Sequence, residues 1–404
     1  MNVLFLTIAR LPEINVRDDY AALIRMFRDN GHNTYMVSPR ERRYKQPTEI
    51  VVQDNVTRLF VKTLNIQKTN LIEKGLGTVL IEYQFKRALK KYLGDTSFDL
   101  IIYSTPPITF PKVIEFLRKK NKNAVTYLLL KDIFPQNAVD LEMFSKRSLL
   151  YKFFRKKELK LYSLTDYIGC MSPANVEYLV RHNPTVDAKN VEIAPNAVEL
   201  EGIEIDKESQ ESKEILAKYQ LPLDKPIFIY GGNLGKPQGV PYLLKCLEAN
   251  KNREDCHFLI VGSGTEYGRL EEWVKNANAK SVTLIPGLPK EDYDKLVKAC
   301  HVGLIFLDHR FTIPNYPSRL ISYLEYKMPV ISATDPNSDV GPISEKNGYG
   351  LWCESNDVDA FTDCVDKMLK ADIKGMGEKG YEFLKKNYLI ENLYNPIIQR
   401  LNKN

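Results

Sequence analysis

The chain is poor in cysteine and histidine, and neither residue type is arranged as a metal site. Its six cysteines are widely spaced, with no CxxC pair and no Cys/His cluster of zinc-ligand spacing. We therefore expect reduced thiols, a reducing compartment and no metal. Long apolar runs are also missing. The stretch near the start extends only from Val3 to Ile8, too short for a signal-peptide core or a spanning helix, which predicts a cytoplasmic protein.

Biased tracts and short internal repeats are absent as well, which excludes disordered, fibrous and solenoid classes. With 44% apolar and 27% charged residues, the composition is that of a soluble globular protein. The 404 residues are enough for two domains of ordinary size. The basic excess lies within the first 200 residues, whereas the remainder is net acidic. This asymmetry indicates an anionic partner for the first half, such as phospholipid headgroups, a diphosphate or nucleic acid.

Short β-rich runs alternate with helical patterns along the whole chain, which is typical of parallel sheets with crossover helices. The series of strands restarts at Ile227–Tyr230 after a polar linker between Glu199 and Ser212. We therefore expect two doubly wound α/β domains, residues 1–200 and 201–380, followed by a helix at 381–404. Ligands of such sheets bind beyond the carboxyl ends of the strands, and the cleft between two such domains is the expected site.

A glycine-rich turn follows the strand Ile227–Tyr230. Gly232 and Asn233 lie in this turn, and Lys236 comes directly before a predicted helix. Glycines allow the backbone to approach a phosphate, and the amides and helix start supply partial positive charge. A tight turn that needs positive φ angles is the alternative, but three glycines and a lysine exceed what a turn requires. We favour phosphate or sugar contact.

The next strand, Phe258–Val261, runs into a second glycine turn that includes Gly264. This turn resembles a dinucleotide fingerprint, but its third glycine is one position late. No acidic residue for a ribose follows the next strand, which ends at Ile285 with Pro286 and Gly287. The pattern is therefore weak evidence for NAD.

The segment from Phe311 to Ser332 is the most informative part of the sequence. A loop that contains Pro314 and Asn315 enters a helix at Ser318, and Arg319 stands in its first turn. Cations are unfavourable at a helix N-terminus, so an arginine there indicates a bound anion. The alternative is a surface ion pair with a nearby carboxylate. We favour a diphosphate because of the glycine turns upstream.

Polar residues also follow two strands of the first half. Asp132 follows the strand Val125–Leu130 and can act on a sugar hydroxyl, or else cap a helix. Ser104 and Thr105 follow Leu100–Tyr103, and contact with an acceptor and a simple turn are equally well supported.

The segment 146–164 combines an apolar helical face with a cluster of lysines and Arg155. Such a helix can lie on an anionic bilayer, but an amphipathic helix packed on its sheet has the same pattern. The helical pattern alone supports the two interpretations equally. A second basic segment at 86–91 favours membrane contact.

In these segments the chain resembles family 4 glycosyltransferases of the GT-B fold, particularly bacterial capsule and O-antigen enzymes. The resemblance covers nearly the whole chain and is carried by motifs in a specific order: Lys131–Pro135, Ala194–Asn196, Gly231–Gly235, Val261–Gly264, Gly287–Pro289 and Pro317–Arg319. It implies two facing Rossmann-like domains, the first binding an acceptor and the second a nucleotide sugar, with a C-terminal helix that crosses back to the first.

The resemblance further implies a retaining, metal-independent transferase that moves a hexose or N-acetylhexosamine-type sugar from a nucleoside diphosphate sugar, with UDP as the expected carrier. The acceptor would be a lipid-diphosphate-linked sugar or a saccharide in surface polysaccharide synthesis, at the inner face of the plasma membrane. No cofactor is implied beyond the nucleotide-sugar co-substrate. The implied roles are catalysis for Asp132, Arg319 and Lys236, acceptor binding for Ser104 and Thr105, and donor binding for Gly232, Asn233, Gly264, Leu288, Pro314, Asn315, Ser318, Arg319, Leu320, Ser322 and Glu325.

One family feature is missing. The paired glutamates that are eight positions apart in the family fall here on Pro314 and Ser322. Contact with the donor ribose would then come from Ser322, from Glu325 one turn later, or from neither. The Asp357–Asp359 pair resembles a metal-binding DxD motif, but it opens a predicted helix, so we expect capping from it.

The main alternative is a UDP-sugar 2-epimerase of the same two-domain build, for which His309 is the one candidate histidine. A two-domain sugar-binding protein would need a signal peptide. A nucleic-acid binder would need aromatics on a stacking surface, whereas Phe153 and Phe154 follow helical core spacing. We expect neither of these two classes.

Overall fold

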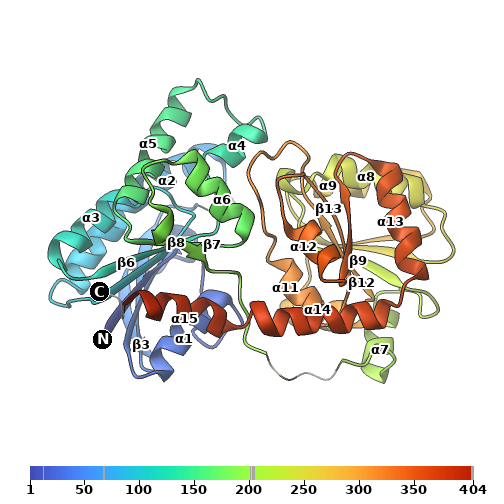
Figure 1. Cartoon of the computed structure of the whole chain (residues 1–404), viewed down its shortest axis with the longest axis horizontal. Helices are drawn as coiled ribbons and strands as arrows, with labels where there is room; N and C mark the ends of the chain where they lie inside the picture. Colours follow the sequence, from blue (N-terminus) through green and yellow to red (C-terminus); the bar gives the residue numbers. More distant parts are fainter. Residues whose placement is uncertain (12, 67–68, 201, 203–204, 402–404) are drawn as a thin grey trace. The chain divides into compact units, whose positions relative to one another are not determined.

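The computed structural model in Figure 1 describes residues 1–11, 13–66, 69–200, 202 and 205–401; the side chains of residues 71 and 72 also lie outside the description. The chain divides into two compact units, which consist of Met1–Glu199 with Leu389–Asn404, and of Leu200–Tyr388. Each unit contains its own sheet with helices around it, so the expected α/β class with two doubly wound sheets is confirmed (Figure 1).

The sheet of the first unit has eight strands in the order β3-β4-β2-β1-β5-β6-β7-β8. All neighbours are parallel except β3 and β4. The strands are β1 Asn2–Leu6, β2 Asn33–Glu41, β3 Glu49–Gln53, β4 Val56–Thr63, β5 Leu100–Ser104, β6 Val125–Leu130, β7 Tyr167–Cys170 and β8 Val191–Ile193.

The antiparallel hairpin of β3 and β4 was not expected from the sequence. Its turn consists of Asp54 and Asn55, both with positive φ, which suits a tight two-residue connection. Val52 of β3 is 71% exposed, so this edge strand lacks the buried apolar run by which central parallel strands are recognised.

The helices of the first unit are α1 Asp19–Asp29, α2 Leu71–Tyr92, α3 Pro111–Lys120, α4 Gln136–Asp140, α5 Leu149–Ser163, α6 Pro173–His182 and α15 Ile390–Leu401, with short 3-10 turns at Arg42–Tyr44 and Ala188–Asn190. The last helix, α15, packs against α1, and the ring centroids of Phe27 and Tyr394 are 4.8 Å apart. The end of the chain thus completes the core of the first unit.

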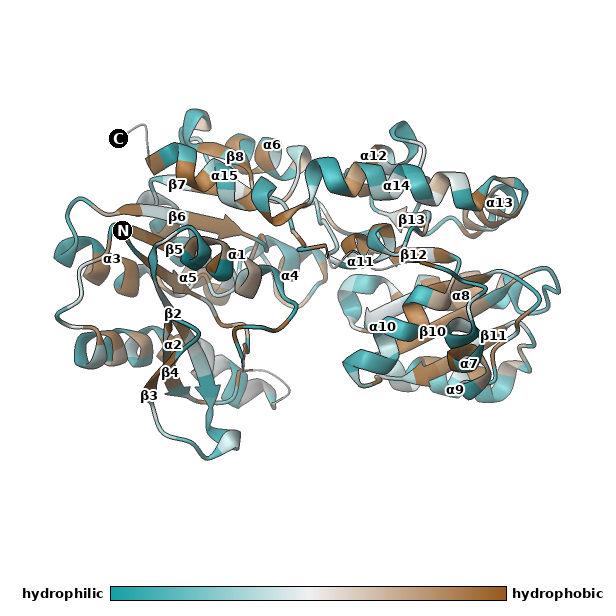
Figure 2. Cartoon of the chain, turned by 90° about the horizontal axis from the view of Figure 1, so that it is seen from below, coloured by the Kyte–Doolittle hydropathy of each residue, from teal (hydrophilic) through white to brown (hydrophobic). Residues whose placement is uncertain are grey.

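The second unit has a six-stranded, all-parallel sheet in the order β11-β10-β9-β12-β13-β14. Its strands are β9 Ile227–Asn233, β10 His257–Ser263, β11 Val282–Pro286, β12 Val302–Phe306, β13 Val330–Thr334 and β14 Gly350–Glu354. Its helices are α7 Gln210–Lys218, α8 Val240–Asn250, α9 Tyr267–Ala277, α10 Lys290–Ala299, α11 Arg319–Glu325, α12 Val340–Lys346, α13 Val358–Lys370 and α14 Ile373–Asn387, with a 3-10 turn, η3, at Lys236–Gln238. In Figure 2 the strands of both sheets are largely hydrophobic, and most helices turn a hydrophilic side outward.

The first unit is interrupted after Glu199, and the second unit ends at Tyr388, whereas the sequence predicted boundaries at 200 and 380. Residue 380 lies inside α14, which packs against α11 of the second unit. The chain returns to the first unit at Leu389, which forms a parallel bridge with Val198. The segment that joins the first unit is therefore α15 alone, and α14 is part of the second unit.

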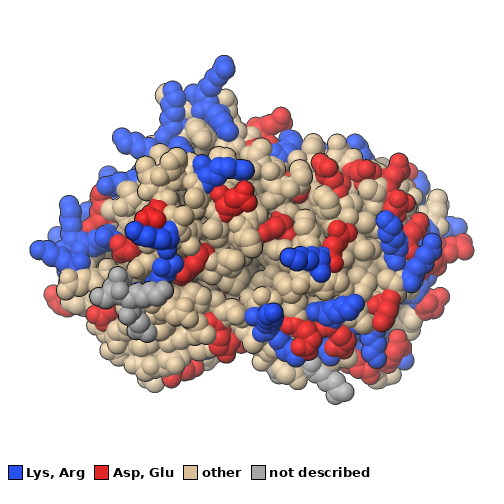
Figure 3. Space-filling model, in the orientation of Figure 1, with Lys and Arg blue, Asp and Glu red and all other residues tan. Residues whose placement is uncertain are grey.

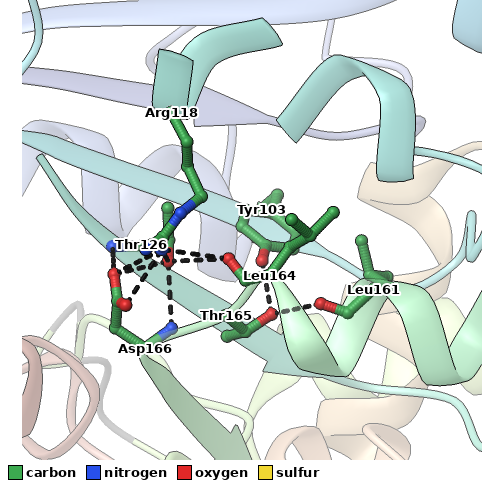
Figure 4. Close-up of polar contacts among 7 residues, drawn as sticks. All are labelled: Tyr103, Arg118, Thr126, Leu161, Leu164, Thr165 and Asp166. Carbon is green, nitrogen blue, oxygen red and sulfur yellow. Dashed lines mark hydrogen bonds and ion pairs between the residues drawn. The ribbon is translucent and has the colours of Figure 1, made fainter. Parts of the chain in front are cut away.

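A polar cluster closes the amino-terminal edge of the first sheet (Figure 4). Nη1 of Arg118 lies 2.8 Å from Oδ2 of Asp166, and the same carboxylate accepts hydrogen bonds from the backbone N and the hydroxyl of Thr126. Arg118 also donates to the carbonyl of Leu164, and the Thr165 hydroxyl donates to that of Leu161. These groups are all paired with one another and lie at the edge opposite the strand ends where ligands bind, so we assign them a structural role.

Within the part of the chain that the structure describes, none of the helices is both long enough and apolar enough to cross a bilayer.

Candidate active site

Loops that follow four strands of the second unit meet at the carboxyl edge of its sheet. The backbone N of Leu234, after β9, donates to the Ser263 carbonyl at the end of β10 at 2.9 Å. The backbone N of Asp308, after β12, donates to the Pro237 carbonyl at 3.0 Å. These main-chain hydrogen bonds fix the glycine turns against each other and against the loop that leads to Arg319.

Arg319 and Gly232 are brought together at this edge, although 87 positions separate them in the sequence. Gly232 has a φ of +116°, and a Cβ there would lie 3.7 Å from Nη2 of Arg319. The guanidinium also stacks on the Tyr230 ring, with Cζ 4.2 Å from the ring centroid. Nη1 of Arg319 is buried and has no hydrogen-bond partner among the described residues. The guanidinium is held by a ring beside the exposed Gly232 backbone and keeps one donor without a partner among the described residues, and this arrangement is suited to an anion.

The glycine turn after β10 needs its glycines for packing. A Cβ on Gly264 would lie 2.3 Å from the Leu234 carbonyl oxygen, and one on Gly262 would lie 1.9 Å from that of Gly232. The turns after β9 and β10 are therefore in direct backbone contact. Gly264 supports the shape of the turn that contains Gly232.

Side chains within the first turn hold its shape. Oε1 of Gln238 accepts from the backbone N of Gly235 at 3.1 Å and from Nδ2 of Asn233 at 3.2 Å. Asn233 and Lys236 are exposed, the latter at the start of η3. Both side chains are thus accessible to a ligand, as their predicted roles require, while contact with a donor stays a prediction.

The loop that contains Pro314 and Asn315 is held by a turn after β13 that was not predicted from the sequence. The backbone N of Asn315 donates to Oγ of Ser338 at 3.1 Å, and Nδ2 of Asn337 donates to the Phe311 carbonyl at 2.8 Å. Asp335 in turn accepts from the Ser338 hydroxyl at 2.8 Å. Burial raises the pKa of Asp335 to about 6, against the lowering effect of these hydrogen bonds. An Asp-Pro-Asn-Ser turn directly after a buried strand was the available signal.

The other predicted donor residues differ in accessibility. Ser318 is exposed and its side chain makes no cap on α11, whereas Leu320 and Glu325 of that helix are buried. Ser322 and Leu288 are partly exposed, and Leu288 follows Gly287, whose backbone lies beside Ser263. Of the two candidates for ribose contact, Ser322 is more accessible than Glu325, and both assignments stay predictions.

In the first unit, Asp132 lies just beyond the carboxyl end of β6. Its Oδ1 accepts a hydrogen bond from Nδ2 of Asn137 at 2.6 Å. Burial raises the pKa of Asp132 to about 6, against the lowering effects of Asn137 and of the Ile133 backbone. The neighbouring Lys131 donates to the carbonyl of Pro195 and to the side chain of Asn196, both at 3.0 Å. The motifs at 131–135 and 194–196 therefore meet at one edge of the sheet.

Ser104 and Thr105 lie at the same edge but are buried. The Thr105 hydroxyl accepts from the backbone N of Lys131 at 3.0 Å and of Asp132 at 3.2 Å. The Ser104 hydroxyl donates to that of Thr7 at 3.2 Å. Both hydroxyls thus join neighbouring strand ends, and that of Thr105 positions the backbone of Asp132. Direct contact with an acceptor stays a prediction.

Two further predicted positions, Asp357 and His309, lie in the second unit. Asp357 caps α13, because its side chain accepts from the backbone N of Ala360 at 2.9 Å, which confirms the expected capping role. His309 is exposed after β12, with Nδ1 3.7 Å from Oδ1 of Asp308.

Comparison with known proteins agrees with this geometry. Residues 211–383 match the family model described as "Glycosyl transferases group 1". The probable glycosyltransferase WbjE of Pseudomonas aeruginosa is 23% identical over 345 residues, which are 84% of this chain and 83% of that protein. The matched residues lie within the second unit, which contains Gly232 and Arg319, so the similarity to group 1 glycosyltransferases includes the candidate site.

Solved structures define the fold over the whole length. Sucrose-phosphate synthase from Thermosynechococcus elongatus superimposes with a TM-score of 0.77 at 16% identity, covering 100% of this chain and 99% of that one. WaaG, a glycosyltransferase involved in lipopolysaccharide biosynthesis, superimposes with a TM-score of 0.65 at 12% identity, covering 99% of each chain. The architecture is that of GT-B glycosyltransferases.

Proposed function

We propose that the protein is a retaining, metal-independent glycosyltransferase that uses a nucleoside diphosphate sugar, with UDP as the expected carrier. It transfers a hexose or N-acetylhexosamine-type sugar to a lipid-linked or saccharide acceptor in surface polysaccharide synthesis, on the cytoplasmic side of the membrane. The match to the group 1 family model supports the donor class, and the role of WaaG in lipopolysaccharide biosynthesis is in keeping with a surface polysaccharide.

One observation carries the proposal: the guanidinium of Arg319 lies beside the positive-φ backbone of Gly232, with Nη1 unused among the described residues. Negative charge develops on the diphosphate as the bond to the sugar breaks. A fixed cation and open amides stabilise that charge in the transition state, which is often the largest catalytic contribution. Exposed Lys236 supplies a second cation from the same turn.

Asp132 is the group that we assign to the acceptor. A pKa of about 6 leaves its carboxylate mostly ionised at pH 7 and makes it a stronger base than an aspartate with the ordinary pKa. Such a group can accept a proton or a hydrogen bond from an acceptor hydroxyl. Asn137 holds the carboxylate and Thr105 holds the backbone N of Asp132 through the contacts described above.

The first test is thermal stabilisation by UDP, GDP, dTDP, CMP and NAD, because a ligand that binds only the folded state raises the melting temperature. We expect a shift with one nucleoside diphosphate, with a loss in Arg319→Ala and partial retention in Arg319→Lys. Arg269→Ala is the matched control, since Arg269 is an exposed arginine of the same unit. A shift with NAD alone, or with no nucleotide, would contradict the assigned site.

Turnover measurements test the role of Arg319 and distinguish a glycosyltransferase from an epimerase. With the identified donor, Arg319→Ala should lower kcat by about a hundredfold or more, as for removal of one transition-state donor, while the fold persists. Near-normal turnover would refute the catalytic role of Arg319. The epimerase alternative is not favoured by the family match, and interconversion of the free nucleotide sugar without any acceptor would revive it.

A further inference from the structure

Helix α2 is apolar on two opposite sides, although only one of them is covered. The covered side packs into the first unit through buried residues that include Ile81, Phe85 and Leu89. Among the described side chains, the other side includes four exposed residues at helical spacing: Leu76 (55% exposed), Val79 (50%), Leu80 (42%) and Tyr83 (63%). Four large apolar side chains on one exposed helical stripe are unusual for a soluble protein, and such patches mark interaction sites.

Helix α5 continues this apolar surface. Phe154, Leu161 and Tyr162 of this helix are buried. The start of the helix remains exposed, however, at Leu149 (83%), Leu150 (48%) and Phe153 (40%). The ion pair between Lys157 and Glu82, at 2.7 Å, fixes α5 to α2. Both helices therefore present exposed apolar side chains on the same unit.

A groove with a volume of about 640 Å³ lies among α2, α3 and α5 and joins the two apolar stripes. Val79, Tyr83 and Phe153 supply apolar walls. The charged lining consists of Lys86, Lys112, Lys156, Lys157 and Lys160, against only Glu82 and Glu115. Five lysines against two glutamates leave a net charge of +3 in the groove.

The two glutamates are already neutralised. Lys157 pairs with Glu82, and Lys160 pairs with Glu115 at 2.9 Å. The hydrogen bond from Lys160 lowers the pKa of Glu115, and the charges of Lys119 and Lys86 add to that effect. Lys86, Lys112 and Lys156 have no carboxylate within ion-pair distance among the described residues. In Figure 3, Lys and Arg side chains gather around the region of α3 and α5.

We propose that the surface formed by α2, α5 and their groove, which we call the docking face, binds an anionic phospholipid bilayer. The apolar stripes enter the boundary between headgroups and acyl chains, while Lys86, Lys112 and Lys156 bind lipid phosphates. Charge complementarity selects this occupant, because a second copy of the chain would bring the same positive charge against itself. The proposal deepens the proposed function by assigning the residues that hold the enzyme at its lipid-linked acceptor.

The test is flotation of the full-length protein with phosphatidylcholine vesicles, with or without phosphatidylglycerol, and without any nucleotide. We expect binding to the anionic vesicles and little to the neutral ones. A charge-reversal variant (Lys86→Glu, Lys112→Glu, Lys156→Glu) and an apolar variant (Leu80→Ser, Tyr83→Ser, Phe153→Ser) should each bind at least about tenfold more weakly. The first loses the attraction to lipid phosphates, and the second loses apolar side chains that enter the bilayer.

Matched controls come from the second unit, where Lys280, Lys346, Lys370 and Leu223 are exposed. Lys280→Glu, Lys346→Glu, Lys370→Glu and, separately, Leu223→Ser should float like the wild type. Melting temperature and nucleotide response verify that every variant is folded. The proposal is overturned if the wild type fails to float with anionic vesicles, or if both docking-face variants bind as the wild type does. It is also overturned if the face instead mediates self-association without vesicles. Because the assay contains no nucleotide, a negative result leaves the transferase proposal standing.

Discussion

Among single residues, Asp132 makes the clearest prediction about pH. If Asp132 acts as a base toward the acceptor, the ionised form is the active one, and ionisation is complete only above its pKa of about 6. We therefore expect kcat/KM to rise from pH 5 to pH 7 with a midpoint near 6. The Asp132→Asn variant should lose most activity and also this dependence on pH. The pH profile of both proteins checks the prediction, and an unchanged midpoint in the variant would contradict it.

Gly264, in the turn after β10, and Gly268, in the first turn of α9, are a matched pair for alanine substitution. A Cβ at Gly264 would lie 2.3 Å from the Leu234 carbonyl, whereas one at Gly268 would meet nothing within 4 Å. We expect Gly264→Ala to lower the free energy of unfolding by about 1–3 kcal/mol, as is typical of overpacking. Gly268→Ala should be neutral or slightly stabilising, because it adds a better helix former in α9. Urea unfolding of the two variants compares them, and equal stability would show that the turns can separate at little cost.

At the scale of elements, the turn after β13 controls the loop from residue 311 to 318. Ser338→Ala removes the acceptor of the Asn315 backbone N and a donor to Asp335. A hydrogen bond of this kind contributes about 1 kcal/mol, so we expect the KM for the donor to rise about fivefold with a smaller change in kcat. Asn347→Ala, at an exposed position of the same unit, is the control. A KM that stays at the wild-type value would show that the loop does not contact the donor.

At the scale of the whole molecule, α15 belongs to the first unit although it follows the second in the sequence. Leu393 and Ile397 are fully buried there, and Nε of Arg400 lies 2.7 Å from Oε2 of Glu192. Truncation of a buried leucine or isoleucine to alanine lowers the free energy of unfolding by about 2–5 kcal/mol. We expect Leu393→Ala with Ile397→Ala to speed hydrogen exchange in β1 and α1, while exchange in β9 and β10 stays as in the wild type.

The exposed Asn395 of the same helix provides the control, since Asn395→Ala removes no core contact. Faster exchange in β9 and β10 as well would mean that the two units unfold together. This outcome would contradict the division of the chain into separately stabilised cores.

Particular residues show how far sequence reasoning extends. The glycine turns, Arg319 and Asp132 all follow parallel strands, and ligand sites of such sheets lie where strands end, so the candidate site was predictable. The turn at Asp335 and Ser338 was missed because it acts through hydrogen bonds to a distant loop; Asn315 lies 23 residues before Ser338. The exposed stripe of α2 was missed because its spacing is the same as that of a buried face.

The sequence by itself determined the α/β class, the two sheets and the strand ends at which chemistry is possible, since these follow from periodicity and from the places where glycine and charge interrupt it. The tertiary structure decided which of those positions meet. It brought Arg319 to Gly232, used the hydroxyls of Ser104 and Thr105 inside the first unit, and left one apolar side of α2 uncovered. Periodicity reports that a residue is apolar or polar, but only packing determines what covers it.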